Sequence, residues 1–464
     1  MIDFRFRLNR HTFVRMYPEY IYFENQVSHI QVMLPASEFA WLSVVLDGAS
    51  YGFEQIYGGT PDKQEAEKTL RQLHEAWVID IETEDGPVLS DRNFSYRHKH
   101  EVERRFADFP LVGIASPTDR PYLQNLQIEL TDACNERCIH CYLPNSKKDR
   151  CKALSKEQVF DILHQYREMG GLKIIFSGGE ILLHPHLFNI LEECRKLDLM
   201  ILLQSNLLTL TEDNVQKIKD LDVFNIQVSL YSTDAHIHDT ITRRKGSFAK
   251  TKRSLELLVQ NDIPALISCP VMDTNFSTVR SLSRYAKDLG VDIYFDYMMM
   301  AQCDGCRDNL DTRLDVAQVK EMVKFDLESK PLFIEAISSS SSLEEALSKK
   351  YARRRSMCKI LSSSLCIDSD GTFYPCPGWN GMILGNIRNS TISEVWHSET
   401  ADKLRAICVA DFTKCKGCDK QNFCNMCVVY NYNELGDMYR ICPRFCEMAE
   451  MFRECVTEKY NELH

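Results

Sequence analysis

At 464 residues the sequence is too long for one ordinary domain, and its formal net charge of −11 is spread along the chain, which argues against a polyanionic partner such as DNA. It has neither a cationic, apolar start nor an apolar run of the roughly 18 residues that a membrane span needs. We therefore expect a cytoplasmic protein with no nucleic-acid and no membrane partner. Disulfides are rare in that compartment, so the nineteen cysteines indicate metal or iron–sulfur ligation.

Residues 1–90 contain no cysteine and predict a small α+β domain of winged-helix type. Aromatic and β-branched residues between 11 and 34 favour two or three short strands. Three helical patterns follow, at 36–48, 51–59 and 61–80. A closing strand from residue 81 and a charged linker at 91–121 end this part of the chain.

Residues 122–312 alternate strand and helix patterns, which predicts an α/β fold with a parallel sheet. The expected strands lie at 126–130, 173–179, 200–206, 225–232, 265–272 and 292–300. Six successive βα units favour a partial (β/α)6 barrel of TIM-like type, in which chemistry lies at the carboxyl ends of the strands. We expect a bridging region at 313–356 and a cysteine-rich domain at 357–464, where helical periodicity fades and metal sites add to the core.

Three cysteines follow the first barrel strand in "TDACNERCIHCYLP", at Cys134, Cys138 and Cys141. Three thiolates without a nearby fourth suit a four-iron cluster with one iron left open for a ligand. The alternative is a zinc site completed by His140 or a distant cysteine. The next strand ends in "FSGGE", where glycines allow the backbone to approach a ligand closely.

Together these motifs resemble those of the radical S-adenosylmethionine (SAM) enzymes, in which SAM chelates the open iron and is cleaved to a 5′-deoxyadenosyl radical. The resemblance implies that the three cysteines hold the cluster and that His140 lies beside the adenine. Gly178, Gly179 and Glu180 would meet the methionyl amino group. Asn206 and Ser229 would lie near the ribose or the carboxylate. The carboxylate partner is open, because "HDTITRRKG" offers Thr242, Arg243 and Arg244 where many relatives have an arginine.

The C-terminal cysteines resemble those of the SPASM domain, which carries two auxiliary four-iron clusters in radical SAM enzymes that act on peptides and proteins. The first cluster would take Cys358, Cys376 and Cys427, with Cys366 as the fourth ligand. The second would take Cys415, Cys418, Cys424 and Cys442, and Cys446 is the alternative to Cys442. Two zinc ribbons are the alternative for the whole domain. With SAM, the resemblance implies three [4Fe–4S] clusters.

Cys303 and Cys306 follow the sixth strand and are tentative catalytic residues. A Cx2C pair at that rim is consistent with a redox pair, a hydrogen-atom donor or a loop without a chemical role. Cys194, Cys269, Cys408 and Cys455 occur in apolar or helical patterns and are expected to pack. Cys151 has no assignment.

The order of elements in residues 1–90 resembles the recognition element of enzymes that modify ribosomally made peptides (RiPPs). In that family a leader peptide adds as a strand to a sheet edge, here expected at 29–34 beside the helix at 62–77. The implied function is an oxidoreductase that matures peptides of the sactipeptide or ranthipeptide type. It would bind a precursor peptide and install a crosslink, for which a cysteine thioether ranks first. A flavodoxin or ferredoxin would supply electrons.

Four other functions remain open on the sequence alone. Two share the peptide substrate: a carbon–carbon crosslinking maturase and an epimerising maturase. The third is a sulfatase-maturase-like oxidase that modifies a folded protein. The fourth is an iron–sulfur sensor with a DNA-binding winged helix, which the acidic charge disfavours.

Overall fold

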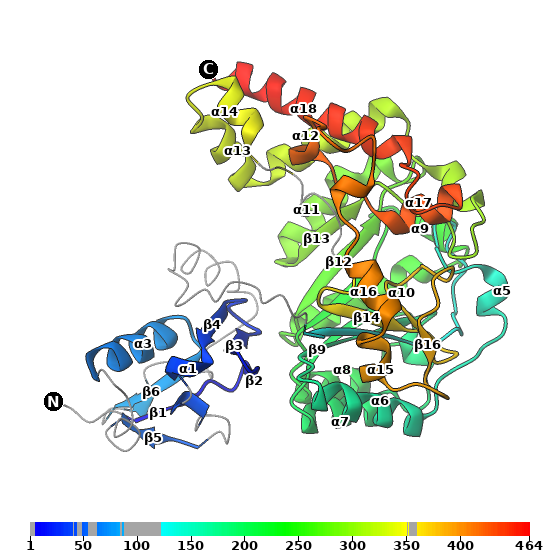
Figure 1. Cartoon of the computed structure of the whole chain (residues 1–464). Helices are drawn as coiled ribbons and strands as arrows, with labels where there is room; N and C mark the ends of the chain where they lie inside the picture. Colours follow the sequence, from blue (N-terminus) through cyan, green and yellow to red (C-terminus); the bar gives the residue numbers. More distant parts are fainter. Residues whose placement is uncertain are drawn as a thin grey trace.

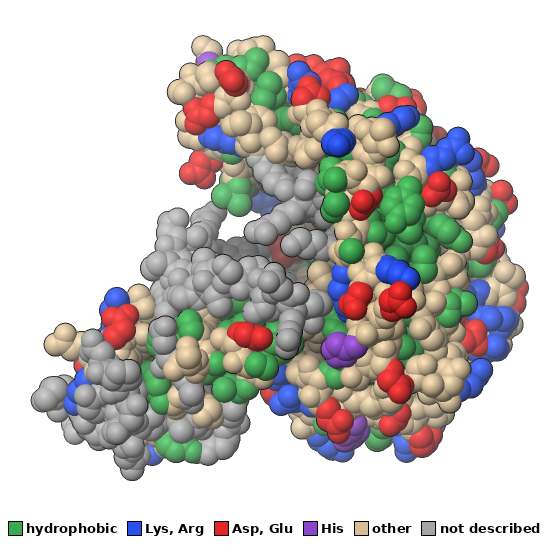
Figure 2. All heavy atoms as spheres, viewed as in Figure 1, with side chains coloured by type: hydrophobic (Ala, Val, Ile, Leu, Met, Phe, Trp, Pro, Cys, Tyr) green, Lys and Arg blue, Asp and Glu red, His purple; other side chains and the backbone are tan. Residues whose placement is uncertain are grey.

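The computed structural model describes residues 5–39, 41–43, 49–53, 63–83, 86–87, 122–349, 351 and 360–464. The predicted linker and Cys358 lie outside the described residues. Within the described residues every cysteine is free, and no helix is both long and apolar enough to cross a membrane. On the face shown in Figure 2, acidic and basic side chains are interspersed over the surface, as the even spread of charge along the sequence suggests.

Six parallel strands, neighbours in the order of the chain, form the barrel sheet and confirm the prediction of a partial (β/α)6 barrel (Figure 1). The strands are β8 (Asn125–Thr131), β9 (Lys173–Gly178), β10 (Met200–Ser205), β11 (Asn225–Ser229), β12 (Ala265–Pro270) and β13 (Asp292–Asp296). The helices between them are α5 (Asn145–Lys148), α6 (Lys156–Glu168), α7 (Leu187–Lys196), α8 (Glu212–Asp220), α9 (Ala235–Thr242), α10 (Ser247–Gln260) and α11 (Val279–Leu289).

Helix α6 shows why these segments fold locally as they do. Its start is fixed by a capping box, in which the Ser155 side chain accepts from the Gln158 backbone and the Gln158 side chain accepts from the Ser155 backbone. Its buried stripe consists of Val159, Ile162, Leu163 and Tyr166. This spacing places all four side chains on one helix face, which packs in the main core with the strands.

The barrel sheet continues into the C-terminal domain, which the sequence did not predict. Strand β14 (Ser364–Ile367) pairs in parallel with β8, and β15 (Thr372–Tyr374) and β16 (Gly385–Asn386) follow as antiparallel strands. The nine strands form one sheet with β13 at its other end. The C-terminal domain is therefore joined to the barrel by main-chain hydrogen bonds.

The expectation that helical periodicity fades in the C-terminal part of the chain is wrong. Helices α12 (Val316–Ser329), α13 (Pro331–Ser338) and α14 (Leu343–Ser348) precede β14, and α15 (Ile392–Trp396), α16 (Glu399–Arg405), α17 (Val428–Leu435) and α18 (Pro443–Leu463) follow it. Helix α18 packs beside α12 (Figure 1). Its apolar stripe is built from Phe445, Ala449, Phe452 and Val456, interspersed with polar residues that weaken the pattern.

The N-terminal domain contains more strand than predicted. Two sheets are present, with orders β5-β1-β6-β7 and β2-β3-β4. Their elements are β1 (Arg5–Leu8), β2 (Thr12–Met16), β3 (Tyr20–Asn25), β4 (Gln31–Pro35), α1 (Ala36–Phe39), β5 (Tyr51–Gly52), α3 (Lys63–Glu75), β6 (Ile79–Thr83) and β7 (Gly86–Pro87). The predicted helix at 51–59 is wrong at its start, because Tyr51 and Gly52 pair with β1 instead.

The sheet β2-β3-β4 packs on the end of the barrel where the strands begin. Phe13, Tyr17, Tyr20 and Tyr22 form a small core with Leu172 and Met200, which lie at the starts of β9 and β10. The buried Arg15 donates from Nε to the Gly171 carbonyl at 2.7 Å and from Nη1 to Asp198 Oδ2 at 2.9 Å. These contacts position the N-terminal domain opposite the carboxyl ends of the strands.

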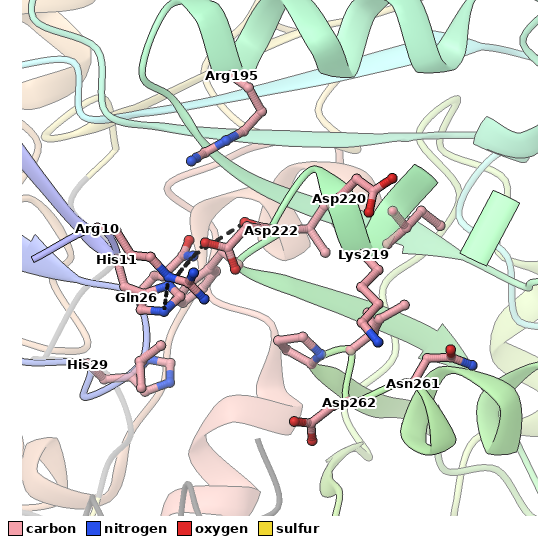
Figure 3. Close-up of a pocket in the computed structure, with 16 residues that line it drawn as sticks. Arg10, His11, Gln26, His29, Arg195, Lys219, Asp220, Asp222, Asn261 and Asp262 are labelled. Carbon is pink, nitrogen blue, oxygen red and sulfur yellow. Dashed lines mark hydrogen bonds and ion pairs between the residues drawn. The ribbon is translucent and has the colours of Figure 1, made fainter. Parts of the chain in front are cut away.

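A cavity of about 510 Å³ lies in this interface. Figure 3 shows His11 and Gln26 of the N-terminal domain facing Asp222, with Arg195 of α7 nearby. Burial raises the pKa of the Asp222 carboxyl, but the contact with His11, whose Nδ1 lies 3.0 Å from Asp222 Oδ2, and the nearby Arg195 and Arg10 together hold it below its usual value. Because Asp222 precedes β11, the cavity is at the far end of the barrel from the predicted chemistry.

We predict that Arg15→Met loosens the docking of the N-terminal domain. The change leaves the buried carbonyl of Gly171 without its side-chain donor, and we expect a loss of about 2 kcal/mol from the free energy of unfolding. Thermal melting and limited proteolysis between the domains would measure it. The control is Arg71→Met, because Arg71 forms an exposed ion pair with Glu67 on α3 and should melt like the parent. Equal melting of both variants would contradict the prediction.

Candidate active site

The three cysteines that follow β8 lie on a loop held by backbone contacts from the end of strand β9 and the end of helix α9. The Gly179 N–H donates to the Thr131 carbonyl at 2.7 Å, and the Glu180 N–H donates to the Ala133 carbonyl at 2.8 Å. A Cβ atom on Gly179 would overlap the carbonyls of residues 132 and 133, so only glycine fits there. On the other side of the loop, the N–H groups of residues 137 and 139 donate to the carbonyls of residues 242 and 241.

Glu180 connects the second and third strand ends. Its buried carboxylate accepts from Ser205 Oγ at 2.7 Å, from the Asn206 N–H at 2.8 Å and from the Leu182 N–H at 3.0 Å. Burial raises the pKa of this carboxyl, although the three hydrogen bonds oppose the shift. A carboxylate has about four acceptor positions, so one remains for a ligand.

The structure places Asn206 against the cysteine loop, where its Nδ2 donates to Asn135 Oδ1 at 2.7 Å. The Thr242 hydroxyl is fully buried and lies 2.7 Å from the Ser247 hydroxyl, so it serves the turn that supports the loop. Arg244 is exposed and donates to the Asn135 carbonyl at 2.8 Å. Of the three candidates for the SAM carboxylate, Arg244 is therefore the one that contacts the cysteine loop through its side chain.

His140 lies edge-on against Tyr231, with ring centroids 4.7 Å apart. Burial, and then the nearby Lys148, lowers the pKa of His140 to about 3, so its ring is neutral at pH 7. The Tyr231 hydroxyl lies 3.9 Å from Cys138 Sγ and also contacts the half-buried Ser229. Tyr231 was missed at the sequence level, although it follows Ser229 by two residues in "QVSLYS".

Lys148 is a second site residue that no sequence motif identified. It ends the four-residue helix α5 and is 2% exposed. Burial opposes its charge, but Cys141, Cys134 and Cys138 together raise the pKa of the Lys148 ammonium, which also hydrogen-bonds Cys141. A buried cation thus faces the three thiols. It matches the negative charge that three thiolates bring to a cluster.

The loop also contains buried polar atoms that have no hydrogen-bond partner within the described part of the chain: Asn135 Nδ2, Glu136 Oε1 and His140 Nδ1. Burial raises the pKa of Glu136 to about 7. Such groups are costly unless a ligand meets them. In the described residues no three His, Cys, Asp or Glu side chains converge as they would around a single metal ion. The thiolates of a four-iron cluster bind different irons and therefore lie further apart. The donor set therefore fits a cluster with a polar ligand beside it.

A buried ion network links the cysteine loop to the C-terminal domain. Lys147 Nζ lies 3.3 Å from Glu129 Oε2 on β8 and 3.2 Å from Asp368 Oδ2 after β14. Tyr142, the neighbour of Cys141, donates from its hydroxyl to Glu129 Oε1 at 2.8 Å. Cys366 on β14 lies in the same region, opposite Gln127 of β8. Burial raises the pKa of its thiol, and the nearby Glu129 and Cys376 raise it further.

The described auxiliary cysteines can be placed by their neighbours. Cys366 lies near both Glu129 and Cys376, whereas Cys427 lines a cavity of about 170 Å³ between β13 and α18. Cys415, Cys418 and Cys424 lie together with Cys446: after burial, Cys446 raises the pKa of both Cys415 and Cys424. Cys442 instead donates to Glu434 Oε2 at 3.5 Å. The geometry therefore favours Cys446 over Cys442 in the second group.

Cys303 and Cys306 lie beside the cysteine loop, as their position after β13 suggests. The Cys303 N–H donates to the Tyr142 carbonyl at 2.9 Å, and the thiol is 4% exposed. Cys306 is half-buried, and its carbonyl accepts from the Gln302 N–H at 2.9 Å. Cys194, Cys269 and Cys455 are buried in the main core, whereas Cys408 is exposed and does not pack as expected.

We predict that Cys446→Ser removes one auxiliary cluster and that Cys442→Ser does not. Reconstituted Cys446→Ser should bind about four irons fewer than the parent, because only Cys446 lies with Cys415, Cys418 and Cys424. Iron and acid-labile sulfide analysis would measure the difference. Cys408→Ser, at an exposed cysteine, is the control. Loss of iron in Cys442→Ser, with full iron in Cys446→Ser, would reverse the assignment.

Two family models match the chain. Residues 128–286 match the radical SAM superfamily, and residues 358–427 match the SPASM iron–sulfur cluster-binding domain. Among curated proteins, an AdoMet-dependent heme synthase of Methanosarcina barkeri is 25% identical over 324 residues, which cover 67% of this chain and 92% of that protein. The subtilosin biosynthesis protein AlbA of Bacillus subtilis is 26% identical over 297 residues, 63% of this chain and 64% of AlbA.

Solved structures share the fold over more of the chain. Streptococcus suis SuiB bound to its precursor peptide SuiA has a TM-score of 0.60 at 15% identity, covering 90% of this chain and 94% of SuiB. The enzyme anSMEcpe with bound AdoMet has a TM-score of 0.57 at 18% identity, covering 74% of this chain and 95% of that one. SAM and several [4Fe–4S] clusters are the cofactors that these domains use. This chain therefore carries a radical SAM domain at residues 128–286, followed by a SPASM domain at residues 358–427.

Proposed function

We propose that this enzyme matures a ribosomally made precursor peptide by installing an intramolecular crosslink. Among the possible crosslinks, a cysteine thioether ranks first. The observation that carries the proposal is an N-terminal sheet with an open edge on the same chain as the radical SAM and SPASM domains. The likeness to SuiB, crystallised with a precursor peptide, includes the N-terminal domain because it covers 90% of the chain. AlbA, named for the biosynthesis of a bacteriocin, supports the same class of substrate.

Strand β4 is the edge that would receive the leader. Within the described residues it pairs only with β3. The Ile30 carbonyl accepts from the Asn25 N–H, and the Ala36 N–H donates to the Glu19 carbonyl, so the even-numbered residues of this strand bond toward β3. In an antiparallel pair the backbone groups of successive residues point to opposite sides, so those of Gln31 and Met33 face the open edge. The side chains of Val32 and Leu34 pack instead in a core with Leu70 and Leu73 of α3. A leader strand would therefore find free N–H and C=O groups beside a buried, rigid support.

At the other end of the barrel, SAM and the cluster would supply the radical that removes a hydrogen atom from the core peptide. Cys134, Cys138 and Cys141 would hold the cluster, and Lys148 would balance its charge. Glu180 and the unpartnered atoms of Asn135 and His140 would orient SAM. A thioether forms with the loss of two hydrogens, one as a hydrogen atom and one as a proton, and the remaining electron would leave through the auxiliary clusters. A cytoplasmic flavodoxin or ferredoxin would supply the initiating electron.

The proposal predicts a peptide lighter by two hydrogens. The reconstituted protein would be incubated without oxygen with SAM, dithionite and a small cysteine-containing peptide encoded beside its gene, and 5′-deoxyadenosine and peptide mass would be measured. Fragmentation would identify the joined residues. An unchanged mass with deuterium uptake from heavy water would indicate epimerisation instead. Absence of both products, with Cys134→Ala behaving like the parent, would refute the proposal.

Leader binding predicts a specific effect of proline on one edge of the sheet. Met33→Pro removes an outward N–H from β4 without touching its bonds to β3, so we expect the affinity for the leader to fall about tenfold. Met16→Pro is the matched control, because Met16 faces outward on β2, the opposite edge of the same sheet. Fluorescence anisotropy with a labelled leader peptide would compare them. Equal loss in both variants would place the leader elsewhere.

A further inference from the structure

The cavity at the base of the barrel is shared by the two domains whose interface it occupies. Its N-terminal wall includes His11, Gln26 and His29, and its barrel wall includes Arg195 of α7 and the turns that precede β11 and β12 (Figure 3). Its volume of about 510 Å³ is in the range of ligand sites, about 300–1,000 Å³. The chemistry proposed at the other end of the barrel does not use this cavity.

Arg195 brings a positive charge into this cavity without a polar partner. The residue is half-buried, and Figure 3 shows its side chain extending from α7 toward Arg10 and His11. In the described part of the chain its guanidinium forms no hydrogen bond and no ion pair, and it lies over the ring of Phe13, whose centroid is 5.3 Å from Cζ. A partly buried charge without a partner favours a ligand of the opposite sign.

The carboxylates of the wall do not satisfy Arg195. Asp222 is paired with His11, and no ion pair joins it to Arg195 in the described residues. The other charged side chains of the wall are exposed to water and carry both signs: Arg10, Lys219, Asp220 and Asp262. A carboxylate from outside the chain would therefore find a partner in Arg195, because a guanidinium can donate two parallel hydrogen bonds to it.

The cavity adjoins the strand edge proposed for the leader. Val27 and His29 line it, and β4 begins two residues after His29, at Gln31. This end of β4 already lies against the barrel, because the rings of His29 and Phe224 meet edge-on with centroids 5.3 Å apart. A peptide paired with the open edge of β4 passes this end of the strand, and two more residues of extended chain cover about 7 Å. The segment next to the paired one is therefore within reach of the cavity.

We propose that the leader, beside the segment that pairs with β4, places an acidic side chain in this cavity, where its carboxylate pairs with Arg195. The inference rests on the proposed function and adds a contact between the leader and the barrel. The leader is then held by both domains at once. A precursor is recognised by a strand-forming segment and by an aspartate or glutamate that lies next to it, on the side where β4 begins.

A double-mutant cycle in binding tests the ion pair and needs no turnover. Each acidic residue of a fluorescently labelled leader would be changed to its amide, and anisotropy would give the Kd with the reconstituted parent and with Arg195→Gln. One amide should weaken binding to the parent about tenfold and leave binding to Arg195→Gln unchanged, because both changes remove the same ion pair.

Lys196→Gln is the matched control for the cycle. Lys196 is the next residue on α7 and forms an exposed ion pair with Glu193, so its Kd for the leader should stay within about twofold of the parent. Amides that cost the parent and Arg195→Gln the same would overturn the inference and leave leader binding standing. A parent that binds no leader would overturn the proposed function instead.

Arg195 also lies against Phe13 of the docking interface, so a second test uses the unchanged protein. The leader would carry p-benzoylphenylalanine at one position at a time, and the complex would be irradiated without reductant, digested and analysed by mass spectrometry. From positions next to the acidic residue that the cycle identifies, attachment within residues 218–224 or 261–264 is expected. Attachment confined to residues 5–39 and 63–83 would overturn the inference and leave the N-terminal sheet as the leader site.

A small anion is the other ligand that a half-buried guanidinium can take. Inorganic phosphate is the probe, and thermal melting of the parent and of Arg195→Gln would be compared with and without it. We expect phosphate to change the two melting temperatures equally. Phosphate that stabilises the parent alone, together with leader amides whose effects do not depend on Arg195, would make the cavity a small-anion site and overturn the inference.

Discussion

The organisation of the active end depends on one buried ammonium group. Lys147 is 7% exposed and lies between the carboxylates of Glu129 and Asp368, which are equally buried. Burying one of these charges alone would cost several kcal/mol, because the interior cannot solvate it. The lysine is therefore paired from two sides, by one carboxylate of the barrel and one of the C-terminal domain. Through Lys147 and Tyr142, the cysteine loop is tied to both domains at once.

The same arrangement explains how a loop with little regular structure can hold a reactive centre. Gly179 and Glu180 clamp one side of it by backbone bonds, and the turn at residues 241–242 clamps the other. Lys148 supplies positive charge where three thiols converge. Between these clamps, Asn135, Glu136 and His140 each have a buried polar atom with no partner among the described residues. The fold thus supplies hydrogen-bond partners to most polar groups of the loop. The remaining groups are those that a bound cofactor would meet.

The sequence predicted what repeats or occurs at fixed spacing. The six barrel strands have strong apolar patterns, and the three cysteines and the "GGE" turn are short motifs whose neighbours in the chain are also neighbours in space. It failed where contacts join distant segments. Strand β14 has four residues and pairs with β8 across more than 230 positions, so no local pattern reveals it. Lys148 is indistinguishable from a solvated lysine until the loop is folded. Cys442, the N-cap of α18, and Cys446 in its first turn are only four positions apart, so the sequence alone does not separate them.

The two ends of the barrel would impose a length on a peptide bound as proposed. The N-terminal sheet docks where the strands begin, while the cysteine loop lies where they end. Strand β8, with seven residues, spans about 23 Å, and an extended chain covers at most about 3.5 Å per residue. A peptide held at β4 and reacting beside the cysteine loop must therefore place at least about seven residues between the two points, and more because its path follows the outside of the domain. The barrel would then act as a ruler, selecting precursors by the distance from leader to modified residue.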